Sequence, residues 1–152
     1  VFLNNCVGCH NGMDPLAQAF AYYDFDETQG RLIYTLGTVR PKYFINSDNF
    51  KPGYVTPDDR WDNRWRLPGP NRALGWDPTL PGYGNGAKSL GEELARSDAF
   101  AECQVEKVFR AICFRSPSDG DQQQFHDSTD GFKATGNLKR VFAEVAAHCA
   151  GD

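Results

Sequence analysis

The sequence predicts a mainly α-helical domain with a long irregular middle segment rich in Pro, Gly and Trp. Two observations support this fold class. Apolar residues recur at helical spacing towards the C-terminus, and prolines crowd the centre of the chain. A length of 152 residues fits one domain, so we treat 1–152 as a single domain. It divides into a motif segment (1–36), an irregular insert (37–88) and a helical segment (89–152).

The first segment holds a Cys-x-x-Cys-His motif at 6–10 and an aromatic cluster at Tyr22, Tyr23 and Phe25. The chain begins without an initiator Met and without the basic and apolar regions of a secretion signal. We therefore expect a mature or trimmed piece of a longer protein.

The insert is irregular because proline removes a backbone donor and clashes with the preceding helical turn. Its prolines are Pro41, Pro52, Pro57, Pro68, Pro70, Pro78 and Pro81. We expect no long helix in this segment.

The last segment is predicted to be helical. Ser89 and Glu92 have the S-x-x-E spacing of a capping box, which predicts that a short helix begins at Ser89. Two amphipathic helices are expected near 98–115 and 136–149, with a polar loop containing Ser116 to Gly120 between them. Their apolar stripes are Ala101, Val105, Val108, Phe109 and Ile112, and Leu138, Val141, Phe142, Val145 and Cys149.

The net charge of -4 argues against nucleic acid as a partner, because phosphate binding requires a clustered excess of Lys and Arg. No stretch approaches the roughly 20 apolar residues of a membrane helix, so no transmembrane segment is expected.

Cys6, Cys9 and His10 form the C-x-x-C-H pattern of covalent haem c attachment. Two thiols add to the vinyl groups on one porphyrin edge, and the adjoining imidazole binds the iron. A thioredoxin-like pair needs a βαβ pattern that is absent here, and zinc needs two more ligands at paired spacing. Structural cysteines beside a surface histidine are the remaining alternative. We predict one haem c, with His10 as an axial iron ligand.

Haem c is attached outside the cytoplasm, so we expect a periplasmic, cell-surface or extracellular protein. Cys103, Cys113 and Cys149 remain, which suggests one disulfide and one thiol. If the two late helices run antiparallel, Cys103 lies level with Cys149, and this pairing is preferred. Cys113 flanks the apolar stripe, so a Cys113–Cys149 bridge is the competing interpretation.

The sixth iron ligand has few candidates. His126 is favoured, because its polar loop would let it reach the haem from the distal side; His148 and an open position are alternatives. Met13 follows His10 by three residues and would lie on the proximal side, so we interpret it as a packing residue.

The stretch Cys6-x-x-Cys9-His10-x-x-Met13-Asp14-Pro15-Leu16, with Phe25-Asp26 and Gly30-Arg31 after it, resembles the C-terminal cytochrome-like domains of a family of bacterial multidomain proteins. Residues 94–103 and 108–115 are similar to the helical end of those domains. Phe114 replaces the family's usual Gly, and the Trp-rich middle has no counterpart. The resemblance implies a small, cytochrome c-like helical haem domain, often fused to others.

Electron transfer is the function that a single haem c predicts, because nothing else in the sequence is required for it. The alternative is a peroxidase-like haem enzyme with an open sixth position, beside which His126 or Arg31 would act. We also expect a redox partner protein, and self-association as a homo-oligomer or filament through the rings of the middle segment, among them Trp61, Trp65 and Trp76. Alternatively these rings wrap the haem and form the core.

Overall fold

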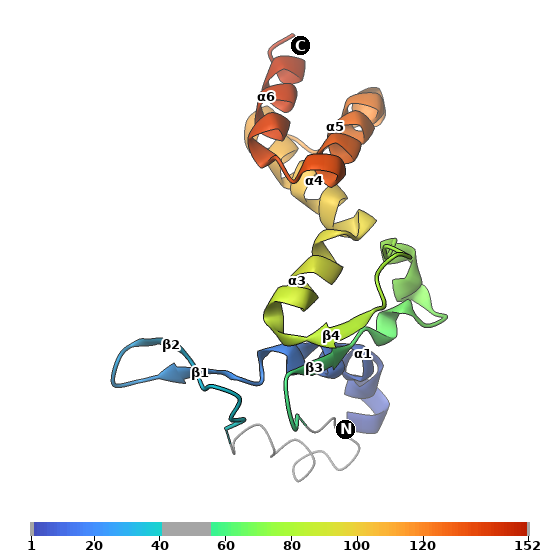
Figure 1. Cartoon of the computed structure of the whole chain (residues 1–152). Helices are drawn as coiled ribbons and strands as arrows, with labels where there is room; N and C mark the ends of the chain where they lie inside the picture. The colour runs from blue at the N-terminus through green and yellow to red at the C-terminus, as the bar shows by residue number, and fades with distance from the viewer. Residues whose placement is uncertain (1, 41–55, 152) are drawn as a thin grey trace. The chain divides into compact units, whose positions relative to one another are not determined.

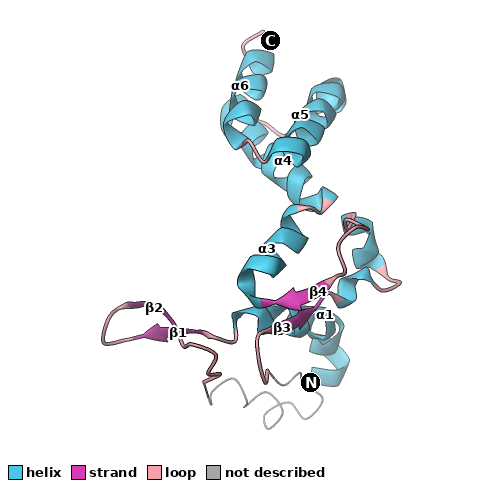
Figure 2. Cartoon of the chain, in the orientation of Figure 1, coloured by secondary structure: helices cyan, strands magenta, loops and turns pink. Residues whose placement is uncertain are grey.

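The computed structural model describes residues 2–40 and 56–151, and it is mainly helical, as predicted (Figure 1, Figure 2). The helices are α1 (Val7–Ala17), α3 (Gly86–Ala95), α4 (Asp98–Cys113), α5 (Gln122–Thr135) and α6 (Leu138–Cys149). The strands are β1 (Tyr23–Asp26), β2 (Arg31–Tyr34), β3 (Arg60–Asp62) and β4 (Tyr83–Asn85). A π-helix (Phe2–Cys6) precedes α1, and short 3-10 turns cover Gln18–Phe20, Arg64–Arg66, Pro70–Leu74 and Asp119–Asp121.

The chain divides into two compact units. The first unit comprises the residues up to Ala73 together with Pro78–Glu93, and the second comprises Leu74–Asp77 together with the residues from Leu94 onwards. Each unit is described separately below. The expectation that 1–152 form a single domain stays a prediction.

The first unit is organised around α1 and the antiparallel pair β3–β4. Trp61 on β3 lies opposite Gly84 on β4 and is only 4% exposed. A Cβ on Gly84 would lie 3.0 Å from the Trp61 ring, so glycine allows the indole to lie over the strand. The Trp61 Nε1 donates to Ser89 Oγ at 2.8 Å, which connects the strand pair to α3.

A buried carboxylate fixes the end of α3 against the 3-10 turn Arg64–Arg66. Glu93 is 1% exposed and accepts hydrogen bonds from Arg66 Nε at 2.7 Å and Nη2 at 2.8 Å. Asn63 Nδ2 donates to the same carboxylate at 2.6 Å. Three hydrogen bonds to one buried anion compensate for its desolvation.

The hairpin β1–β2 was not expected in the first segment. Its residues alternate Tyr-Asp-Phe-Asp, and Tyr23 pairs with Tyr34 while Phe25 pairs with Leu32. Asp26 shapes the turn by accepting from the backbone N–H groups of Thr28 and Gln29, and these bonds, that of Gln29 foremost, lower the pKa of Asp26. The Phe25-Asp26 and Gly30-Arg31 elements of the resemblance therefore lie at the two ends of one turn.

In the described part of the insert, no helix exceeds five residues before Gly86, which confirms the expected lack of a long helix there. The strand pair β3–β4 adds regular structure that was not predicted. Residues 41–55 of the insert lie outside the described residues. Trp61 belongs to the core, whereas Trp65 and Trp76 are partly buried.

The second unit is a three-helix arrangement of α4, α5 and α6 (Figure 1). Its core consists of Val105, Val108, Phe109, Val141 and Val145. The helices predicted near 98–115 and 136–149 are confirmed as α4 and α6. Ser97 caps α4, because its hydroxyl accepts from the Phe100 N–H at 3.3 Å, and Asn137 caps α6 through the Arg140 N–H.

Two predictions about this part of the chain were wrong. The region between α4 and α6 is not a polar loop, because residues Gln122–Thr135 form α5. The helix predicted to begin at Ser89 begins at Gly86. Ser89 does not cap it. Its hydroxyl donates to the Asn85 carbonyl at 2.6 Å and accepts from Trp61 Nε1, so it connects α3 to the strand pair β3–β4.

The preferred disulfide Cys103–Cys149 was also wrong, since the bridge joins Cys113 to Cys149 and Cys103 is an exposed free thiol. The preference assumed antiparallel late helices. Because α5 reverses the chain once more, α4 and α6 run parallel, and the last residues of both helices meet. The competing Cys113–Cys149 pairing is therefore the one that forms.

In the described residues, no helix has both the length and the apolar character needed to cross a membrane.

Candidate functional site

Helix α1 presents the Cys-x-x-Cys-His motif on one face. Cys6 is the N-cap residue, and Cys9 and His10 follow it by three and four residues, so the three side chains neighbour one another along the helix surface. Cys9 is exposed, and Cys6 and His10 are partly exposed. The buried residues of α1 are Gly12, Pro15 and Leu16. Cys6 and His10 lie on the opposite side of the helix, whereas Cys9 lies two turns before Leu16 on nearly the same face and is exposed there.

Both motif cysteines are free thiols, not joined to each other. Their i,i+3 spacing on a helix separates them by less than one turn, as attachment to two vinyl groups on one porphyrin edge requires. The accessible dithiol thus has the chemistry and the exposure that haem c attachment needs.

Asp14 holds the imidazole of His10. The His10 Nδ1 lies 2.9 Å from Asp14 Oδ1, one helical turn further along α1. The His10 side chain is 44% exposed and that of Asp14 is 21% exposed. With Nδ1 bound to a carboxylate, an iron ion would be bound through Nε2. Sequence reasoning gave Asp14 no role, although its i,i+4 spacing from His10 was a usable signal.

Trp65 covers α1 from the other side. A Cβ at Gly12 would overlap the Trp65 indole, so this glycine lets the ring lie directly against the helix. The Trp65 Nε1 is buried and has no hydrogen-bond partner among the described residues.

No group of three or more His, Cys, Asp or Glu side chains in the described residues could hold a metal ion alone. A haem iron does not need such a group, since the porphyrin supplies four ligands and the protein only the axial ones. The donor set Cys6, Cys9 and His10 therefore fits haem, with Asp14 behind the ligand.

His126 lies on α5 and is exposed, not in a loop as expected. It lines a pocket of about 430 Å³ in the second unit, together with Asp98, Glu102 and Lys133. His10 belongs to the first unit, whereas His126 belongs to the second. Its assignment as the sixth ligand stays a prediction.

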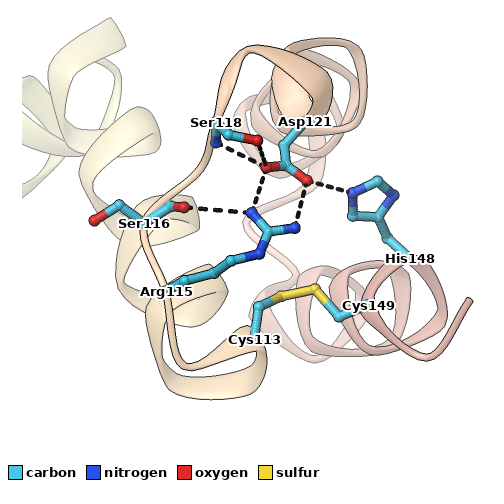
Figure 3. The surroundings of a disulfide bond; sticks show 7 residues. All are labelled: Cys113, Arg115, Ser116, Ser118, Asp121, His148 and Cys149. Carbon is cyan, nitrogen blue, oxygen red and sulfur yellow. Dashed lines mark hydrogen bonds and ion pairs between the residues drawn. A yellow bond between two sulfur atoms is a disulfide. The ribbon is translucent and has the colours of Figure 1, made fainter. Parts of the chain in front are cut away.

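His148 is engaged elsewhere. Its Nε2 lies 2.7 Å from Asp121 Oδ1, in a network beside the disulfide (Figure 3). Asp121 is 2% exposed and also accepts from Arg115 and Ser118. These hydrogen bonds, that of Arg115 foremost, hold the pKa of Asp121 well below its usual range. An ionised carboxylate only accepts, so His148 donates through Nε2 and serves the packing of the second unit.

The remaining candidates are at the surface of the first unit. Met13 is 40% exposed and lies on the same face of α1 as His10. Its interpretation as a packing residue rather than an iron ligand stays a prediction. Arg31 lies at the start of β2 and donates to Gln29 Oε1 at 3.0 Å and 2.8 Å.

Comparison with family models, curated proteins and solved structures gives no match for this chain.

Proposed function

We propose that this chain is a cytochrome c-like electron-transfer domain that carries one haem c covalently bound through Cys6 and Cys9, with His10 as an axial iron ligand. The observation that supports it most is the placement of both free thiols and the imidazole on one accessible face of α1. Packing of α1 in the first unit requires neither the spacing nor the exposure of Cys6, Cys9 and His10.

The haem supplies an iron that cycles between two oxidation states. The residues of this chain hold and tune it. Cys6 and Cys9 anchor the porphyrin edge, His10 binds through Nε2, and Asp14 orients the imidazole.

Haem c attachment implies a periplasmic, cell-surface or extracellular protein. The Cys113–Cys149 disulfide supports such a compartment, because disulfides persist in oxidising surroundings. We further propose a redox partner protein, and self-association as a homo-oligomer or filament. Since Trp61 is buried, it would take no part in this association.

Expression in a host that matures c-type cytochromes tests the haem proposal. The intact mass should exceed the polypeptide mass by one haem, and the double variant Cys6→Ser with Cys9→Ser should be colourless. Cys103→Ser is the matched control, because Cys103 is also a free thiol but lies outside the motif. A colourless wild-type protein from that host would contradict the proposal.

A peroxidase-like haem enzyme is the second candidate. The His10–Asp14 pair favours it, because a carboxylate on Nδ1 strengthens electron donation to the iron and so supports high oxidation states. A high-spin ferric spectrum that binds cyanide rapidly and turns over hydrogen peroxide would favour this candidate over electron transfer.

A further inference from the structure

Asp14 occupies a position that the helix itself disfavours. It lies in the last turn of α1, where the carbonyl ends of the helix repel a negative charge. Aspartate is a poor helix former, and the residue before a proline is disfavoured in helical conformation. Asp14 precedes Pro15 inside the helix. The low helix propensity of aspartate, the helix dipole and the following proline therefore all disfavour an aspartate at this position.

One contact accounts for a carboxylate at this place. The Asp14 Oδ1 lies 2.9 Å from His10 Nδ1, within normal hydrogen-bond distance, and the Asp14 side chain is mostly covered. Partial burial strengthens the bond, because water screens it less than at a fully exposed site. The helix fixes both residues on one backbone, so little side-chain freedom is lost when the pair forms.

We infer that Asp14 is a positioning residue that orients His10 and lowers the midpoint potential of the haem. This inference rests on the proposed function. A carboxylate that accepts from Nδ1–H gives the imidazole partial imidazolate character, which makes Nε2 a stronger donor. A stronger donor and a nearby negative charge both stabilise ferric over ferrous iron. The haem therefore has a lower midpoint potential than the same site would have without the charge of Asp14.

Two substitutions separate charge from hydrogen bonding. Asp14→Asn keeps an amide oxygen that accepts from Nδ1–H but removes the charge, whereas Asp14→Glu keeps the charge. Spectroelectrochemistry of the haem-loaded chain should give a higher midpoint potential for Asp14→Asn and a potential close to wild type for Asp14→Glu. Far-ultraviolet circular dichroism checks that both variants are folded.

Glu27→Gln is the matched control. It removes one negative charge from an exposed position in the hairpin turn, away from His10, and should leave the potential unchanged. Equal potentials for wild type and Asp14→Asn, or an equal shift in Glu27→Gln, would overturn the inference while the haem proposal stands. A wild-type chain that takes up no haem would overturn both, so the two failures are distinguishable.

Discussion

Cys113 and Cys149 are bonded where two parallel helices end, with their Cα atoms 5.7 Å apart. One turn earlier on the same helices lie Phe109 and Val145, both fully buried. Each cysteine packs against that core, so the bridge extends the apolar contact between α4 and α6 by one more turn. The bridge also fixes the alignment of the two helices along their axes, because it holds their last residues at the same level.

Loss of this bridge should destabilise the second unit strongly. A sequence separation of 36 residues corresponds to about 4 kcal/mol in the chain-entropy model, so Cys113→Ser should lower the free energy of unfolding by that order. Urea unfolding followed by circular dichroism measures the change.

Cys103→Ser serves as the control for the bridge, since it also removes a sulfur from α4 but at an exposed site. We expect its free energy of unfolding to lie within about 0.5 kcal/mol of the wild-type value. Peptide mapping without reduction should recover Cys113 and Cys149 in one linked peptide. Recovery of a Cys103–Cys149 peptide instead would contradict the parallel alignment.

Glu93 should be the most sensitive charge in the first unit. Glu93→Ala removes the acceptor of Asn63, which is buried, and of Arg66, which is partly buried, and this costs about 3 kcal/mol. The neighbouring Glu92 is exposed, so Glu92→Ala should change stability by less than about 0.5 kcal/mol. Chemical unfolding of both variants is the measurement, and equal stabilities would disprove the role of Glu93.

Phe114 should be replaceable with a gain in stability. It ends α4 with φ 54° and ψ 23°, the left-handed region that favours glycine, and the residue is 91% exposed. Phe114→Gly relieves backbone strain and loses little contact, so we expect a gain of about 0.5 to 1 kcal/mol. Phe114→Ala removes the same ring but keeps a Cβ, and it should not be stabilised. Thermal unfolding distinguishes the two, and a destabilised Phe114→Gly would show that the ring has an unrecognised contact.

Apolar residues that recur at helical spacing made part of the fold predictable. The stripes of α4 and α6 predicted both helices because burial of Val105 and Val141 repeats with the helical period. Helix α5 could not be predicted in this way, since its sequence Gln122–Thr135 is mostly polar and its two buried residues are Ser128 and Thr129. Its hydrophobic contacts with the core come from Phe125 and Phe132. Missing that helix reversed the assumed direction of α6 and led to the wrong disulfide. The S-x-x-D spacing from Ser118 to Asp121 was a usable signal, because these residues form a capping box.

At the candidate site, the motif itself predicted which side chains share a face, because i,i+3 and i,i+4 spacing needs no tertiary information. The buried partners were not predictable. Trp65 contacts α1 from more than fifty residues away, and nothing in the local sequence indicates that Gly12 makes room for it. Tyr23 and Phe25 alternate with aspartates, a pattern that indicates a strand. These rings were interpreted only as an aromatic cluster, so the strand was not predicted.

Acid should destabilise the second unit through Asp121. Its pKa is lowered in the folded protein by Arg115 first, then by Ser118 and His148, whereas an unfolded aspartate titrates near pH ~3.9. A depressed folded pKa stabilises the fold above the unfolded value, and that contribution is lost as the pH falls below about 4. Asp121→Asn should be less stable at neutral pH and should lose less stability on acidification.

Asp119 provides the control for this acid dependence, because it is exposed two residues before Asp121. Asp119→Asn should follow the wild-type curve of unfolding free energy against pH between about pH 2 and 7. If the free energies of unfolding of wild type and Asp121→Asn changed in parallel with pH, the hydrogen bonds of Asp121 would not couple folding to protonation.

The sixth iron ligand, if the chain supplies it, is expected to be His126. Besides His10 and His126, the sequence contains one other imidazole, His148, and one thioether, Met13. Met13 lies on the same helix face as His10, so it approaches the porphyrin from the same side. His148 donates through Nε2 to Asp121, and binding iron through that atom would break a buried network. His126 is exposed on α5 and takes no part in that network.

Six-coordinate bis-histidine iron is low-spin and lacks the weak long-wavelength band that marks methionine coordination. We therefore expect a low-spin ferric spectrum without that band in the wild type, and a high-spin spectrum in His126→Ala. His148→Ala should remain low-spin but unfold at lower urea concentration, because it removes one hydrogen bond from Asp121. An unchanged spectrum in His126→Ala would move the assignment to His148. A high-spin wild type that binds cyanide rapidly would leave no protein ligand in the sixth position and would favour the haem enzyme over the electron carrier.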